Sequence, residues 1–150
     1  MNYVIIDLDG TLCDCSQRVH LAQAGKWDDF HSLIADDQPF KDVASFIDLI
    51  SNLEFVSIIM LTGRNESYRN QTDRWMNKHS IVCDRLIMRP DKNFESDHVL
   101  KPRMLCDEVF EGNFEKMKEE VIVVLEDRDK VVEAWRNLGI DCWQVRNGTY

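Results

Sequence analysis

The feature that most constrains the fold is a short apolar run, residues 3–6, that two aspartates follow at once. The run contains β-branched residues and no alternation of apolar and polar side chains, which is typical of a strand buried on both faces of a parallel sheet. Gly10 and Thr11 then indicate a tight turn. Ligands of open parallel sheets bind at the carboxyl ends of the strands, so Asp7 and Asp9 are candidates for chemistry. For an isolated Asp-x-Asp-Gly, a solvated turn is about as good an explanation as a functional site. Other parts of the chain are needed to distinguish the two.

Four further apolar runs predict four further strands, and the segments between them have helical periodicity. The strands are expected at residues 55–61, 81–88, 121–125 and 140–145, and the helices at 43–50, 66–79, 97–110 and 131–138. Pro102 should lie in or near the first turn of its helix, and Gly139 should follow the last helix. The alternation predicts an α/β fold with a Rossmann-like, mostly parallel sheet flanked by helices. Residues 1–150 suit a single domain, in which the irregular residues 13–38 form a small loop or cap insertion.

Charge and composition narrow the classes of protein that the chain can belong to. The net charge of −9 argues against a general binder of nucleic acids or membrane surfaces. Residues 64–103 are an exception, because they carry nine basic and six acidic residues. Solvated helix faces and a wall facing an anionic substrate explain this segment equally well, and Arg64, Arg89 and Arg103 are the first candidates for such a wall. Five cysteines without a Cys-x-x-Cys pair, no signal peptide and no run of transmembrane length predict a cytoplasmic protein without a membrane partner.

Polar residues follow three of the predicted strands, and one lysine lies near a helix start. They are Asp7 and Asp9, Thr62 and Arg64, Glu126 and Asp127, and Lys101. Parallel strands bring their carboxyl ends to one edge of the sheet, so these residues can converge. Oxygen ligands without histidine or cysteine favour a hard cation such as Mg²⁺. A hydroxyl and a lysine beside Mg²⁺ suit a phosphoryl group, an aspartate can attack it, and a second acid can transfer protons.

In their order along the chain, these segments resemble the four motifs of the haloacid dehalogenase superfamily of phosphohydrolases. The matching residues are Asp7-Leu8-Asp9-Gly10-Thr11, Thr62-Gly63, Lys101 and Glu126-Asp127. The resemblance implies a haloacid dehalogenase-like fold and an Mg²⁺-dependent reaction through an aspartyl-phosphate. It implies that Asp7 is the nucleophile and a metal ligand. It also implies that Asp9 is the general acid/base and binds Mg²⁺ through its backbone carbonyl.

The remaining motifs carry further implied roles. Thr62 is expected to hydrogen-bond the phosphoryl group and Lys101 to neutralise it, whereas Glu126 and Asp127 are expected to hold the metal. Four other residues are expected to contact substrate: Thr11, Gly63, Arg64 and Arg89.

The C-terminal part is similar to one group in this superfamily, the 3′-phosphatase domains of bacteriophage polynucleotide kinase/phosphatases. The similarity lies in residues 126–136 and 139–145, and in Arg89 and Asp97. The chain departs from that group at Glu126, where an aspartate is usual, so Asp127 is the safer metal ligand. No kinase domain is expected in the chain, because the phosphate-binding pattern G-x-x-x-x-G-K-[ST] is absent.

The cap insertion is short, so we expect an open site that accepts a polynucleotide end. Arg18, His20, Trp27 and Phe30 could line its mouth. The first hypothesis is a 3′-phosphatase of DNA or RNA ends, in the host cytoplasm if a phage encodes it. The second is a phosphatase of free nucleotides or other small phosphomonoesters. The third is a non-catalytic module that binds phosphate or nucleic acid.

Overall fold

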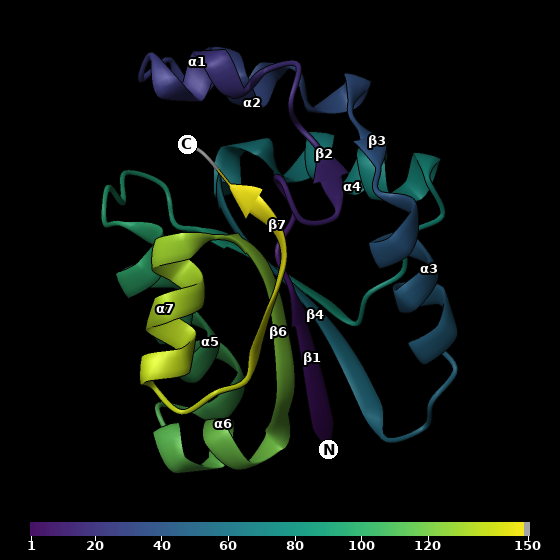
Figure 1. Cartoon of the computed structure of the whole chain (residues 1–150), viewed down its shortest axis with the longest axis vertical. Helices are drawn as coiled ribbons and strands as arrows, with labels where there is room; N and C mark the ends of the chain where they lie inside the picture. The colour runs from purple at the N-terminus through teal and green to yellow at the C-terminus, as the bar shows by residue number, and fades with distance from the viewer. Residues whose placement is uncertain (149–150) are drawn as a thin grey trace.

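The computed structural model describes residues 1–148, and its centre is a five-stranded sheet in the order β5-β4-β1-β6-β7 (Figure 1). Every pair of neighbouring strands in this sheet is parallel. The strands are β1 (Asn2–Ile6), β4 (Val56–Asn65), β5 (Arg85–Arg89), β6 (Val121–Arg128) and β7 (Cys142–Gly148). The predicted α/β fold with a parallel sheet is therefore confirmed.

Helices cover both faces of the sheet, and β1 packs against both layers (Figure 1). One layer contains α5 (Asp97–Phe110), α6 (Phe114–Glu120) and α7 (Asp129–Asn137), and the other contains α3 (Lys41–Ile50) and α4 (Arg69–Lys78). Ile5 belongs to the core cluster on the α5 side, whereas Val4 and Ile6 belong to the cluster on the α3 side. Side chains alternate between the faces of a strand, so a run that is apolar throughout fits this central position.

The insertion after β1 lies across the carboxyl ends of the strands (Figure 1). It contains β2 (Cys13–Asp14), α1 (Val19–Gln23), α2 (Trp27–Ser32), a 3-10 turn η1 (Ile34–Asp36) and β3 (Gln38–Pro39). The two short strands pair antiparallel. Trp75 of α4 donates a hydrogen bond of 2.9 Å from its indole N–H to the backbone carbonyl of Asp37, which fixes the insertion to the domain below.

Gly139 follows α7 as predicted, and its φ of 77° explains the need for glycine. Its N–H donates to the carbonyl of Arg136 at 2.9 Å, and the N–H of Ile140 donates to the carbonyl of Trp135 at 3.1 Å. These two bonds form a Schellman motif, which satisfies carbonyl groups that the helix end leaves open.

Three details differ from the sequence predictions. The third strand begins at Arg85 and not at Ile81, because the Asp84 carboxylate accepts the Ile58 N–H at 2.7 Å just before the strand starts. Pro102 is the sixth residue of α5, beyond its first turn. The α6 helix was not predicted, since only Met117 among its seven residues is buried. Another helix start, η2 (Glu66–Tyr68), precedes α4. None of the helices within residues 1–148 is long and apolar enough to cross a bilayer.

Candidate active site

Asp7 lies directly after β1 and is held there by the neighbouring strand. Its backbone N–H donates to the carbonyl of Leu125 in β6 at 3.1 Å. The carboxylate, whose residue is 5% exposed, accepts a hydrogen bond of 2.6 Å from Lys101 Nζ. Its second oxygen accepts one of 3.0 Å from the Thr11 hydroxyl. The structure therefore brings together Asp7, Thr11 and Lys101 from two distant parts of the chain.

Lys101 bridges Asp7 and Glu126. Its ammonium group lies 2.7 Å from Glu126 Oε2 and is only 2% exposed. The other oxygen of Glu126, Oε1, accepts the backbone N–H of Asp127 at 3.2 Å. Both oxygens of this fully buried glutamate thus have donors within the protein. Contact with two carboxylates raises the pKa of Lys101 even though burial opposes it, so Lys101 stays charged.

The carboxylates of Asp7, Glu126 and Asp127 form a cluster that lacks positive charge. Their nearest oxygens lie within 4.8 Å of one another, and Lys101 is the cation that contacts them among the described residues. Burial, followed by repulsion between neighbouring carboxylates, raises the pKa of Asp7 to about 7 and that of Asp127 to about 9. Once all three carboxylates are ionised, they and the one lysine leave two negative charges. An all-oxygen site with this charge fits one Mg²⁺ ion.

Asp9 lies in a separate network of buried arginines. Arg64 of β4 donates to both of its oxygens, at 3.0 Å from Nε and 2.6 Å from Nη2. Arg18 also donates to Asp9 and pairs with the buried Asp37 at 2.5 Å. Burial alone would raise the pKa of Asp9, but Arg64 and then Arg18 outweigh it and hold that pKa well below its usual range. Asp9 is therefore ionised in this arrangement.

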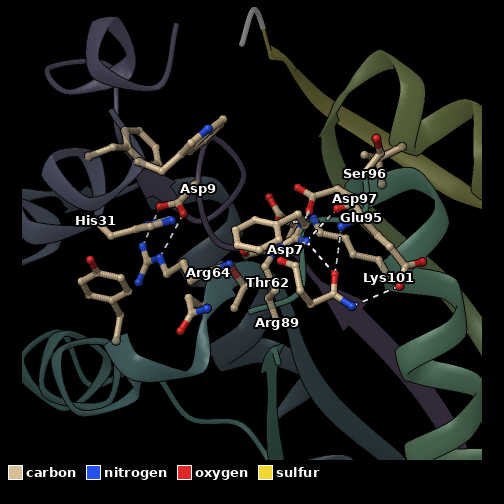
Figure 2. Close-up of a pocket in the computed structure, with 18 of the residues that line it drawn as sticks. Asp7, Asp9, His31, Thr62, Arg64, Arg89, Glu95, Ser96, Asp97 and Lys101 are labelled. Carbon is tan, nitrogen blue, oxygen red and sulfur yellow. Dashed lines mark hydrogen bonds and ion pairs between the residues drawn. The ribbon is translucent and has the colours of Figure 1, made fainter. Parts of the chain in front are cut away.

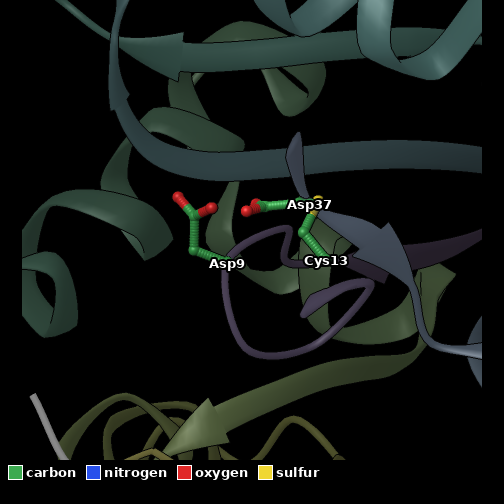
Figure 3. A group of neighbouring side chains, drawn as sticks. All are labelled: Asp9, Cys13 and Asp37. Atoms are coloured by element: carbon green, nitrogen blue, oxygen red, sulfur yellow. The ribbon is translucent and has the colours of Figure 1, made fainter. Parts of the chain in front are cut away.

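A second group with metal-ligating side chains contains Asp9, Cys13 and Asp37 (Figure 3). Its two carboxylates are matched by the two guanidinium groups of Arg18 and Arg64. Burial raises the pKa of the Cys13 thiol well above its ordinary value, so the sulfur is neutral. This group is already balanced in charge, which distinguishes it from the Asp7 cluster and argues against a metal there.

Thr62, Gly63 and Arg64 form the end of β4, where the pairing with β5 shifts in register between Thr62 and Asn65. The Thr62 hydroxyl accepts the N–H of Arg64 at 3.2 Å. A Cβ atom on Gly63 would lie 2.5 Å from the Asp97 carboxylate, so glycine leaves the space that this side chain occupies. Such irregularities at strand ends reorient side chains toward a site.

Arg89 fixes the segment between β5 and α5. It donates to the carbonyls of Gly63 at 2.9 Å and Glu95 at 2.6 Å, and it pairs with Asp97. Arg64 and Arg89, both predicted to bind substrate, thus already have protein partners, as does Arg103, which pairs with Glu95. A direct contact of substrate with the Arg64 or Arg89 guanidinium would therefore compete with these protein partners.

The two networks face one cavity of about 560 Å³. Figure 2 shows Asp9, Arg64 and His31 on one side of it, and Asp7, Lys101 and Asp97 on the other. The volume lies in the range of about 300–1,000 Å³ that is common for ligand sites. Of the residues expected at its mouth, Trp27 and Phe30 line the cavity, Arg18 is buried behind it, and His20 is exposed elsewhere.

Sequence analysis missed Asp37, His31, Tyr68 and Phe94 as site residues. No sequence pattern links Asp37 to Arg18, because the fold of the insertion is what brings the two side chains together. His31 and Tyr68 have ring centroids 5.0 Å apart although 37 positions separate them in the sequence. No local pattern identifies such a pair.

The comparisons with known proteins agree with this geometry. The family model of the polynucleotide kinase PNKP phosphatase domain matches residues 1–150. A protein of Autographa californica nuclear polyhedrosis virus, named as a bifunctional polynucleotide kinase/RNA ligase, is 29% identical over 130 residues, which are 86% of this chain and 18% of that protein. The chain thus spans about a fifth of the curated relative.

Solved structures give the same result. A chain of the Pnkp1/Rnl/Hen1 complex is 29% identical with a TM-score of 0.82, and the match covers 99% of this chain and 46% of that one. A haloacid dehalogenase-like hydrolase from Streptococcus pneumoniae is 14% identical with a TM-score of 0.64, over 95% of this chain and 83% of that one, and it supports the fold. The chain belongs to the family of polynucleotide kinase PNKP phosphatase domains, which makes it a phosphatase of the haloacid dehalogenase type.

Proposed function

We propose that the protein is an Mg²⁺-dependent phosphomonoesterase that removes 3′-phosphates from polynucleotide ends through an aspartyl-phosphate. The observation that carries this proposal is the position of the Asp7 carboxylate. It contacts Lys101, belongs with Glu126 and Asp127 to a cluster whose ionised carboxylates exceed the positive charge beside them, and lines the cavity. The family supports a phosphatase for polynucleotide ends, and the name of a solved relative's assembly, an RNA repair complex, favours RNA among these ends.

Asp7 and Asp127 would hold the metal in this proposal, together with the backbone carbonyl of Asp9. Bound Mg²⁺ would supply positive charge to the phosphoryl oxygens as charge develops on them. Glu126 acts through Lys101, because both of its oxygens are already engaged. The lysine, which contacts the Asp7 nucleophile, would neutralise charge on the phosphoryl group.

The reaction proceeds in two steps. The Asp7 carboxylate forms a bond to phosphorus while the bond from phosphorus to the 3′ oxygen breaks. Asp9 is ionised while it pairs with Arg64 and Arg18, so it must leave these partners and take up a proton from solvent before it gives that proton to the 3′ oxygen. Asp9 then takes a proton from the water that attacks the aspartyl-phosphate. This second step releases inorganic phosphate and restores both aspartates.

Thr62 and Thr11 complete the phosphoryl site. The Thr62 hydroxyl lies at the end of β4 and lines the cavity, where it can donate to a phosphoryl oxygen. Thr11 donates to Asp7 and holds its carboxylate in place for attack.

The test is phosphate release from a 3′-phosphorylated oligonucleotide, its 5′-phosphorylated twin and a free 3′-nucleotide, each with Mg²⁺ and with EDTA. Asp7→Asn serves as the blank, because it removes the nucleophile and changes little in size. Selective, Mg²⁺-dependent release from the 3′-phosphorylated oligonucleotide is expected. Release that is equal in EDTA contradicts the metal site, and full activity of Asp7→Asn contradicts the covalent route.

A free nucleotide is the second candidate substrate, and the acidic protein surface favours it. A chain with a net charge of −9 gains little from a long polyanion. Faster release from the free 3′-nucleotide than from the oligonucleotide would leave the chemistry intact and replace end repair by nucleotide turnover.

A further inference from the structure

We infer that the mouth of the cavity binds the terminal base of the substrate on an aromatic rim made by Trp27 and Phe94. The inference rests on the proposed function, since it takes the cavity to hold a phosphorylated end. It adds that the protein recognises a nucleobase as well as the phosphate. Trp27 begins α2 of the insertion, and Phe94 lies in the loop between β5 and α5.

Trp27 is held in place by aromatic neighbours although it is 46% exposed. Its ring packs edge-on against Phe30, with centroids 5.8 Å apart, and stacks against His31 at 6.3 Å. His31 is only 8% exposed, and its Nδ1 has no hydrogen-bond partner among residues 1–148. Burial lowers the pKa of His31 to about 4, so it supports Trp27 as a neutral ring.

Phe94 is 93% exposed, yet its backbone is fixed on both sides. Arg89 donates to the carbonyls of Asn93 and Glu95, which flank it, at 3.2 and 2.6 Å. Lys92, two residues earlier, has a positive φ of 57°. The protein therefore presents a phenyl ring to solvent from a loop of defined shape. Folding gains almost nothing from this ring, whereas a flat apolar ligand would bury it.

The charges near the rim favour a base over the phosphodiester backbone as the second contact. The lysines Lys92 and Lys130 share the cavity wall with three acidic residues, Asp28, Asp91 and Glu95. A protein that binds successive phosphates of a nucleic-acid strand needs a continuous positive groove. Among the described residues, the cavity wall does not form such a groove. Stacking on aromatic rings is independent of such a groove and tolerates any base.

The test compares two 3′-phosphorylated oligonucleotides that differ only at the last residue. One ends in a normal nucleotide, and the other carries a tetrahydrofuran unit without a base. Wild-type protein should prefer the base-bearing end by about 10-fold or more in kcat/KM, a factor typical of one stacked base. Trp27→Ala and Phe94→Ala should each raise KM for that end and leave the abasic end unchanged, whereas Trp27→Phe should retain the preference.

Two exposed aromatic residues outside the cavity give matched controls. Trp143 is 55% exposed and Phe55 is 73% exposed, so Trp143→Ala and Phe55→Ala remove similar surfaces elsewhere and should leave both substrates unaffected. Equal hydrolysis of the two ends by wild-type protein, or variants at the rim that slow both ends equally, would overturn the inference and leave the proposed function standing. Failure to hydrolyse either end overturns the proposed function, and the inference with it.

A binding measurement gives a readout that does not depend on turnover. Trp75 and Trp135 are buried, so the indoles of Trp27 and Trp143 are the ones a ligand can reach. Titration of Asp7→Asn protein with the base-bearing oligonucleotide should quench tryptophan fluorescence. The quench should disappear when Trp27→Phe is added to Asp7→Asn, and a quench that persists in that double variant contradicts stacking on Trp27.

Discussion

Glu126 Oε2 lies 2.7 Å from Lys101 Nζ, and this contact occupies the glutamate on the side facing α5. Its other oxygen accepts the N–H of Asp127, so we propose that Glu126 positions Lys101, whereas Asp127 has the freer carboxylate. The extra methylene of glutamate relative to aspartate provides the reach to the lysine.

Shortening Glu126 and neutralising Asp127 should therefore have different effects. Glu126→Asp should lower kcat by about 10- to 100-fold with little change in the Mg²⁺ concentration that gives half-maximal rate, because Lys101 loses one of its two carboxylate partners. Asp127→Asn should raise that Mg²⁺ concentration strongly. Titrations of phosphate release against Mg²⁺ distinguish the two, with the exposed Glu133→Gln as a control. A large shift in the Mg²⁺ requirement of Glu126→Asp would instead make Glu126 a direct ligand.

Asp9→Asn should affect the two chemical steps differently for different leaving groups. Arg64 and Arg18 hold the pKa of Asp9 well below its usual range, so Asp9 must leave these arginines and take up a proton before it can act as an acid. A 3′ alkoxide needs that proton, whereas nitrophenolate leaves without one. Asp9→Asn should therefore release a burst of nitrophenolate equal to the protein from p-nitrophenyl phosphate and then stall. With an oligonucleotide, the first step itself should slow by about 10²–10⁴-fold.

Asp7→Asn is the control in this experiment, because it should give neither a burst nor turnover. Steady turnover of both substrates by Asp9→Asn would remove Asp9 from proton transfer. Rapid-quench measurements of nitrophenolate and phosphate, taken together, separate formation of the aspartyl-phosphate from its hydrolysis.

The sequence predicts the sheet and the convergence at its edge because these depend on local patterns. Apolar runs identify the strands, and parallel pairing then brings Asp7, Lys101 and Asp127 together wherever they lie in the chain. The partner of a long side chain does not follow in this way. Arg64 lies at the carboxyl end of β4, close to the expected place, but only tertiary packing decides that its guanidinium turns toward Asp9. The pairing of Arg18 with Asp37 depends on the same packing.

Element boundaries fail for related reasons. The short α6 helix has little apolar periodicity, and its clearest signal is Asn113, whose side chain accepts the N–H of Lys116 at 3.0 Å as an N-cap. The start of β5 depends on a side chain, Asp84, that bonds to the backbone of another strand. Neither feature produces a hydrophobic pattern.

The metal-free protein should lose stability as the pH rises from about 7 to 8.5. The pKa of Asp127 is about 9 in the folded protein and 3.8 as a model value, so the folded state binds the proton more tightly and ionisation favours unfolding. The fall should reach at most about 1.4 kcal/mol per pH unit. His31, with a folded pKa of about 4, makes stability rise with pH between about pH 4 and 6.5. The measurement therefore starts at pH 7, above the range in which His31 titrates.

Urea unfolding in EDTA across this window measures the effect. Mg²⁺ should abolish the fall, because it binds the ionised carboxylates of the folded state. Asp127→Asn should flatten the curve in EDTA. Stability in EDTA that stays constant or rises from pH 7 to 8.5 would contradict the charge deficit in the Asp7 cluster.

Substrate binding should depend only weakly on salt and on oligonucleotide length. Lys92 and Lys130 are the lysines at the cavity mouth besides the buried Lys101, so about two phosphates beyond the terminal one can be neutralised. A plot of log kcat/KM against log salt for a single strand should then have a slope of about −1.4 or shallower. Oligonucleotides of three and twelve residues should react with similar kcat/KM, and Lys92→Ala with Lys130→Ala should flatten the slope. A slope near −4, or a kcat/KM that rises steadily with oligonucleotide length, would contradict this prediction. Either result would mean that the strand binds a positive groove outside the cavity mouth.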